Sequence, residues 1–102
     1  MPKRDRTRQS PLDLPRFGRV IYQRRNDLGL TLNEVGTRAG FASGDYISLI
    51  ERGKRAPDLD KVPFLADALQ MDARTLCELW LRQYQPLAAD ALGIDADFHG
   101  SD

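Results

Sequence analysis

The chain has 102 residues, 41% of them hydrophobic and 8% aromatic, which is enough for one domain with one modest core. Its one cysteine, Cys77, excludes an internal disulfide and a cysteine-based zinc site, and its apolar runs fall short of the roughly 20 residues that span a bilayer. The formal net charge is zero, but residues 1–25 hold eight Lys or Arg against two Asp, whereas residues 86–102 hold four Asp and no Lys or Arg.

Residues 1–13 are predicted to form a flexible arm. They are polar, contain Pro2 and Pro11, and show no helical period. They also lack the apolar stretch of a secretory signal, so we expect none. A basic arm attracts polyanions by displacing their counterions. The alternative is that the basic and acidic ends of the chain are simply solvated termini.

Two helices are predicted next. The first covers roughly residues 15–28, because apolar side chains recur at helical spacing and Gly29 closes the run. Pro15 suits its first turn. The second helix begins at Thr31, whose spacing to a glutamate three residues later matches a capping box. It ends at Gly40, where a positive φ is favoured.

A third helix is predicted to start at Ser43 or Gly44, with Ser43 as its N-cap. Gly53 ends this helix within a basic turn, and Pro57 follows.

The next two helices are predicted from aspartate caps. Asp58 is expected to cap a fourth helix that runs to Leu69, with an irregular first turn because Pro63 lacks a backbone N–H. Asp72 is expected to cap a fifth helix that ends before Pro86.

The pattern therefore predicts an all-α protein, a compact five-helix bundle without strands. We divide the chain into a basic arm at 1–13, a helical domain at 14–85 and an acidic tail at 86–102. Apolar residues within 87–98 allow one more short turn in that tail.

Residues 31–53 meet the geometric demands of a helix-turn-helix. Two short helices that cross at roughly 90–120° need a small residue at the crossing and a turn residue that accepts a left-handed conformation. Gly36 and Gly40 occupy those positions. The residues that can anchor the crossing from inside are Phe41, Ile47 and Ile50. The alternative interpretation is an ordinary pair of core helices.

Over residues 16–83, about two-thirds of the chain, the sequence resembles the lambda-repressor-like helix-turn-helix family, also called the XRE family. The matching motifs are Arg25, Leu28-Gly29-Leu30-Thr31, Glu34-Val35, Ala39-Gly40-Phe41, Ile47-Ser48-Leu49-Ile50-Glu51-Arg52-Gly53, Pro57-Asp58 and Leu65-Ala66-Asp67-Ala68-Leu69. The resemblance implies a five-helix domain that binds operator DNA as a dimer and regulates transcription in bacteria or phages.

The sequence departs from the family pattern at three places. Leu32 stands where the family often has a Gln that touches a phosphate, and Gly36 stands where it often has Ala. One extra residue lies between Gly40 and Ile47.

The resemblance places the base-reading positions at Ser43, Gly44, Asp45, Ser48 and Leu49. This set lacks the Arg, Gln and Asn that make bidentate contacts to guanine or adenine, so the expected base readout is thin. Candidates for phosphate and minor-groove contacts are Arg4, Arg6, Arg8, Thr31, Lys54 and Arg55. For Lys54 and Arg55 the alternative is a solvated turn.

Two further expectations concern structure and assembly. The resemblance implies an ion pair between Arg25 and Glu51 that orients the third helix. The fifth helix carries more apolar surface than one core-facing stripe needs, which predicts a homodimer interface centred on Trp80 and Tyr84. The interface candidates are Trp80, Leu81, Tyr84, Leu87, Leu92 and Phe98. The alternative is that the tail covers its own fifth helix, which would leave a monomer.

Catalytic chemistry is not expected. Cys77 lies beside Leu76 and Leu79 at core spacing, His99 has no cysteine or histidine neighbours, and no strand precedes a glycine-rich phosphate loop. We therefore expect no enzyme activity, cofactor, metal or small-molecule ligand.

The leading functional prediction is a sequence-specific transcriptional regulator, a repressor that binds double-stranded DNA as a homodimer in the bacterial cytoplasm or nucleoid. The alternatives are a protein-interaction module, and an antitoxin or phage control protein with weak or no DNA binding.

Overall fold

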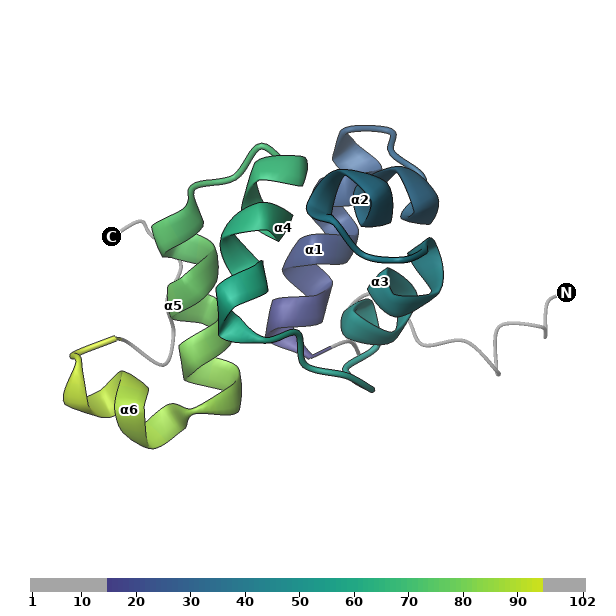
Figure 1. The fold of residues 1–102 in the computed structure, drawn as a ribbon. Helices are drawn as coiled ribbons and strands as arrows, with labels where there is room; N and C mark the ends of the chain where they lie inside the picture. The colour runs from purple at the N-terminus through teal and green to yellow at the C-terminus, as the bar shows by residue number, and fades with distance from the viewer. Residues whose placement is uncertain (1–14, 95–102) are drawn as a thin grey trace, which may run out of the picture.

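The computed structural model describes residues 15–94, and within that range it contains helices and no strand (Figure 1). The elements are α1 (Arg16–Asp27), α2 (Leu32–Ala39), α3 (Gly44–Glu51), the 3-10 turn η3 (Leu59–Lys61), α4 (Val62–Ala68), α5 (Ala73–Tyr84) and α6 (Pro86–Ala91). The all-α prediction and its five helices are confirmed. A sixth helix lies where only a short turn was expected, because Pro86 suits a helix start as well as it ends α5.

The helices surround one core. In Figure 1, α1 lies between the α2–α3 pair and the α4–α5 pair, and α6 extends from the end of α5. The largest side chains with no exposed surface are Phe17, Ile21, Val35, Ile47, Ile50, Val62, Leu65, Leu69 and Leu76. Every helix from α1 to α5 contributes at least one of them, so the bundle is held by a shared core rather than by separate helix pairs.

Most of the predicted helix caps are present. The Thr31 hydroxyl accepts from the Glu34 amide at 3.0 Å, and the Glu34 carboxylate accepts from the Thr31 amide at 2.8 Å. Asp72 accepts from the Thr75 amide at 2.9 Å. Gly40 has the left-handed φ of +86° that the end of α2 was predicted to need.

The start of the fourth helix differs from the prediction. Asp58 makes no side-chain capping bond, because the chain first forms η3, in which the Lys61 amide donates to the Asp58 carbonyl at 2.8 Å. Leu59 is 37% exposed in that turn. The predicted irregular start of the fourth helix is confirmed, because η3 precedes α4. Pro63 lies in the first turn of α4, where no backbone N–H is required. Pro15, which was expected in the first turn of the first helix, is the N-cap of α1.

Side chains from distant elements complete the helix ends. The Gln83 carboxamide on α5 accepts from the Phe17 amide at 2.8 Å, which supplies an acceptor for the first turn of α1. Arg24 donates to the carbonyls of Leu69 at 2.9 Å and Gln70 at 3.1 Å, which satisfies the end of α4.

α6 packs mainly on α5. Ala89 is fully buried in that contact, and Arg82 donates to the Asp90 carboxylate and the Ile94 carbonyl, both at 2.6 Å. Within residues 15–94, no helix combines the length and apolar character needed to cross a membrane.

Candidate nucleic-acid interface

The two helices of the motif, α2 and α3, cross so closely that backbone touches backbone. A Cβ atom on Gly36 would lie 2.7 Å from the Ser43 carbonyl oxygen. A Cβ atom on Gly44 would lie 2.6 Å from the backbone nitrogen of Asn33. Both distances are far below van der Waals contact, so only glycine fits at these two positions. The predicted role of Gly36 at the crossing is therefore confirmed. Gly36 stands where the family often has Ala, and here the Ser43 carbonyl leaves no room for that side chain.

Gly44 was predicted among the base-reading positions, and it is the one of them that the structure buries. The residue is buried against the first turn of α2 and presents no side chain to solvent. The remaining positions are accessible: Asp45 is exposed, and Ser43, Ser48 and Leu49 are half-buried. Ser43 accepts from the Asp45 amide at 3.2 Å, so its hydroxyl acts as the N-cap of α3.

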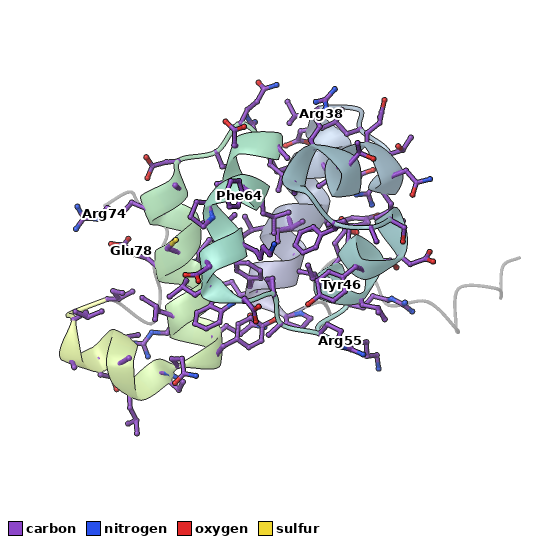
Figure 2. All side chains as sticks on the ribbon, in the orientation of Figure 1. Arg38, Tyr46, Arg55, Phe64, Arg74 and Glu78 are labelled. Carbon is purple, nitrogen blue, oxygen red and sulfur yellow. The ribbon has the colours of Figure 1, made fainter. Side chains whose placement is uncertain are left out.

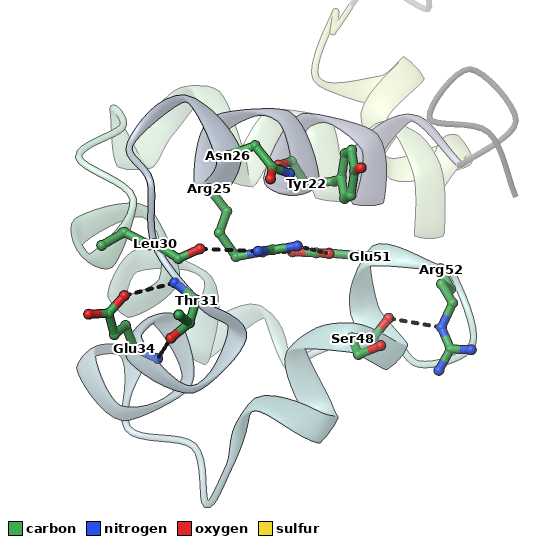
Figure 3. Close-up of polar contacts among 9 residues, drawn as sticks. All are labelled: Tyr22, Arg25, Asn26, Leu30, Thr31, Glu34, Ser48, Glu51 and Arg52. Carbon is green, nitrogen blue, oxygen red and sulfur yellow. Dashed lines mark hydrogen bonds and ion pairs between the residues drawn. The ribbon is translucent and has the colours of Figure 1, made fainter. Parts of the chain in front are cut away.

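An ion pair ties α1 to the end of α3, as Figure 3 shows. Arg25 donates to both carboxylate oxygens of Glu51, at 2.7 and 3.0 Å, and to the Leu30 carbonyl at 3.1 Å. The pair is nearly enclosed, with 12% of the Arg25 side chain and 6% of the Glu51 side chain exposed. This bidentate geometry fixes both the direction and the distance of α3 relative to α1.

The basic turn after α3, residues 52–55, is exposed. The side chains of Lys54 and Arg55 make no hydrogen bond or ion pair with any residue from 15 to 94, and Figure 2 shows Arg55 pointing away from the bundle. Arg52 donates to the Ser48 carbonyl at 3.4 Å. The turn thus presents cations beside the open face of α3.

Two aromatic side chains hold the segment that follows this turn. The Tyr46 hydroxyl on α3 donates to the Ala56 carbonyl at 3.4 Å, and the Trp80 indole on α5 donates to the Pro57 carbonyl at 2.8 Å. Tyr46 in turn packs on Phe41, with ring centroids 4.9 Å apart. The position of the basic turn is therefore held by side chains from α3 and from α5.

The remaining candidates for phosphate and minor-groove contacts are Thr31 and the three arginines near the N-terminus. Thr31 is exposed, but its hydroxyl already serves the capping box of α2. Arg4, Arg6 and Arg8 lie outside the described residues. The Pro15 ring lies directly against Gly53, where an added Cβ would clash with the Pro15 Cγ. The described chain therefore begins beside the basic turn.

The interface candidates of the fifth helix are largely used within the chain. Trp80 and Tyr84 are half-buried, and Tyr84 packs edge-on against Phe17 with centroids 5.8 Å apart. Leu81 is half-buried, whereas Leu87 on α6 and Leu92 at its C-cap are exposed, and Phe98 lies outside the described residues. The Trp80 and Tyr84 rings thus already pack in the bundle, and an interface with a second copy centred on them stays a prediction.

Sequence reasoning missed several residues that shape this site. Asn33 accepts from the Gly44 amide at 2.8 Å, and Tyr46 and Trp80 hold the basic turn. An Asn in the first turn of a helix suggests that its side chain caps a helix end. The sequence does not show that Asn33, which lies in α2, caps the start of α3.

The comparisons with known proteins agree with this geometry. The Helix-turn-helix domain family matches residues 16–79. The chain belongs to the helix-turn-helix family. A crystal structure of the restriction-modification controller protein C.AhdI from Aeromonas hydrophila is similar at 30% sequence identity and a TM-score of 0.56, over 65% of this chain and 94% of that one. No curated protein matches the chain.

The predicted lambda-repressor-like, XRE-type identity of this helix-turn-helix protein is therefore confirmed. Within residues 15–94, no group of three or more His, Cys, Asp or Glu side chains is arranged to hold a metal ion. Burial raises the pKa of the Cys77 thiol, which keeps it protonated at neutral pH and unsuited to nucleophilic attack.

Proposed function

We propose that this helix-turn-helix protein is a sequence-specific DNA-binding transcriptional regulator that represses by occupying a dyad operator as a homodimer. The observation that carries the proposal is the α2–α3 unit, whose tight crossing presents one face of α3 beside an exposed basic turn. Proteins of this class place the second helix of the motif in the major groove.

Base reading is assigned to the open side of α3. Asp45 is exposed in its first turn, where a carboxylate can accept from a cytosine amine. Ser48 lies nearly one turn later, where a hydroxyl can bond to several base edges, and Leu49 can contact a thymine methyl. These contacts are few, so sequence preference depends on placing them accurately.

Affinity is assigned to the cations. Lys54 and Arg55 have no partner within residues 15–94 and are proposed to contact phosphates, which position a protein without reading sequence. Arg4, Arg6 and Arg8 are proposed to enter the minor groove. The Pro15–Gly53 contact supports this, because it starts the arm next to the same basic turn.

The similarity to C.AhdI, a restriction-modification controller protein, supports a regulatory role for this chain. Repression needs only that the protein occupy its operator and exclude another protein from it. Two copies place two reading helices one DNA turn apart, roughly 34 Å, which is why a dyad operator is proposed.

Selection of bound duplexes from a random pool, followed by binding at two salt concentrations, tests this function. We expect one sequence to be enriched and affinity to fall steeply with salt. Lys54→Ala should weaken all duplexes about equally and reduce the salt slope by about one, whereas Asp45→Ala should change which sequence is preferred. A protein that enriches no sequence and shows no salt dependence is an interaction module instead.

A further inference from the structure

The seam between the first turns of α2 and α3 is where the two helices are fixed to each other. The Gly44 backbone packs directly on the backbone of Leu32 and Asn33, and the Ser43 carbonyl packs on Gly36. Side chains that would normally fill a helix crossing are therefore missing here. Because backbone meets backbone at this point, interlocking side chains do not set the register of this turn, and a directional bond adds to the core packing behind it.

Asn33 supplies that bond. Its Oδ1 atom accepts from the Gly44 amide at 2.8 Å, and within residues 15–94 this is the one side-chain hydrogen bond that joins α2 to α3. Gly44 is the first residue of α3, and its amide has no partner inside the helix. The next amide, that of Asp45, is held by the Ser43 hydroxyl at 3.2 Å.

We propose that Asn33 is a positioning residue for sequence reading, acting through the Gly44 amide on the adjacent Asp45 and, one turn later, on Ser48. The inference rests on the proposed function and assigns to it a residue outside the reading face. Hydrogen bonds to base edges demand accurate placement, whereas attraction between Lys54 or Arg55 and phosphates tolerates small shifts. Losing the Asn33 bond therefore lowers discrimination between sequences more than it lowers general affinity.

The test compares Asn33→Ala with Asn33→Asp. Alanine removes the acceptor, whereas aspartate keeps an acceptor for the Gly44 amide. Each variant is titrated against the duplex recovered by selection and against a mixed-sequence duplex, at a temperature where circular dichroism shows it fully folded. We expect Asn33→Ala to reduce the ratio of the two affinities about tenfold, equivalent to about 1.4 kcal/mol, and to leave binding to the mixed duplex nearly unchanged.

Asn33→Asp should restore the ratio while weakening binding to both duplexes equally, because its added negative charge repels phosphates. Gln23→Glu is the matched amide-to-carboxylate control, since Gln23 is exposed on α1, outside the α2–α3 unit. It should leave both the ratio and the two affinities close to those of the wild-type protein.

Hydrogen exchange of the Gly44 amide reports on the bond without DNA. We expect faster exchange in Asn33→Ala than in the wild-type protein and in Asn33→Asp. Gly44→Ala, at a temperature where circular dichroism shows it fully folded, should lower the same affinity ratio, because its Cβ would push α3 away from α2.

Two outcomes overturn the inference while leaving the proposed function intact. One is an unchanged affinity ratio in Asn33→Ala, and the other is an equal loss of the ratio in Asn33→Ala and Asn33→Asp. If the wild-type protein itself prefers no sequence, the proposed function fails, and the inference that rests on it fails as well.

Discussion

Arg25 joins three parts of the chain through one side chain. Its guanidinium donates to both oxygens of Glu51 at the end of α3 and to the Leu30 carbonyl before α2, and it lies 5.6 Å from the centre of the Tyr22 ring. Glu51 is the one charged residue buried among residues 15–94. A carboxylate held away from water is tolerated only when a cation and hydrogen bonds replace the lost solvation.

The variant Glu51→Gln should therefore lower the free energy of unfolding by about 3 kcal/mol, because it leaves the largely buried guanidinium of Arg25 without its counter-charge. Denaturant unfolding followed by circular dichroism measures the change. The control is Arg74→Ala, which removes an ion pair with Glu78 on the outer side of α5. The Arg74 side chain is 85% exposed, so we expect a change below about 0.5 kcal/mol. Equal losses in the two variants would contradict the structural role of the buried pair.

The segment between α3 and η3 contains the basic turn to which we assign the proposed phosphate contacts. It has no regular structure, yet Pro57 is fully buried and the Ala56 and Pro57 carbonyls accept from Tyr46 and Trp80. The indole N–H of Trp80 thus connects α5 to the turn that carries Lys54 and Arg55. Trp80 was expected at an interface with a second copy, but its polar edge binds its own chain.

Trp80→Phe keeps an aromatic ring but removes the indole donor and part of the packed ring, so we expect a loss of at least about 1 kcal/mol in unfolding free energy and weaker binding to duplex DNA. Combining the change with Lys54→Ala distinguishes loosening of the turn from general destabilisation. If Trp80 acts through the turn, the two effects on affinity are less than additive. Tyr46→Phe should have a smaller effect, because its hydrogen bond is 3.4 Å long against 2.8 Å for Trp80.

The start of α5 gives a prediction about pH. Hydrogen bonds from the Thr75 amide and hydroxyl hold the pKa of Asp72 below its usual range. Since the folded-state pKa is lowered, the capping contribution is complete above the unfolded pKa and is lost as pH falls through the folded one. The thermal midpoint of Asp72→Ala should therefore lie below that of the wild-type protein at neutral pH. The two midpoints should converge on acidification below the usual Asp range, and a difference independent of pH would contradict this role.

Local signals made most of these elements predictable. The two partners in the Thr31–Glu34 cap, and those in the Asp72–Thr75 cap, are three residues apart, so both partners of each cap can be recognised within one short stretch of sequence. Asp58 carries the same signal, but burial of the nearby Pro57 and the 3-10 turn redirect the chain. The bonds from Trp80 to Pro57 and from the Phe17 amide to Gln83 span 23 and 66 residues. Such partners are determined by packing, so no local pattern in the sequence predicts them.

At the scale of the whole molecule, the candidate DNA-binding face and the exposed apolar surface lie at different places. The α2–α3 pair and the basic turn occupy one side, and α6 projects from the far end of α5 (Figure 1). Phe64 on α4, labelled in Figure 2, is another exposed apolar side chain, and 58% of its surface is accessible. The surface away from the proposed DNA-binding face is therefore available to the second copy of the proposed homodimer.

The outward face of α6 is the surface we expect that second copy to cover. Leu87 is 83% and Leu92 67% exposed, and Ala88 and Ala91, also exposed, lie within one helical turn of them. The helix's one acidic residue, Asp90, is drawn toward α5 by Arg82, so its charge does not interrupt this face. The small alanines allow close approach, and two leucines contribute about 1.5 to 3 kcal/mol each when fully buried.

Changing Leu87 and Leu92 together to Glu should therefore weaken self-association at least about tenfold, since each buried carboxylate would have to be desolvated at the interface. Sedimentation equilibrium of the free protein, and of its complex with a duplex carrying two half-sites, measures this. Phe64→Glu adds a like charge at the other exposed apolar site and should leave the association unchanged, whereas a chain ending at Gln85 should be monomeric. Dissociation by Phe64→Glu alone would move the interface to α4. An intact protein that stays monomeric at micromolar concentrations, both free and on DNA, would exclude the dimer, because a face of this size would then be stable in water without a partner.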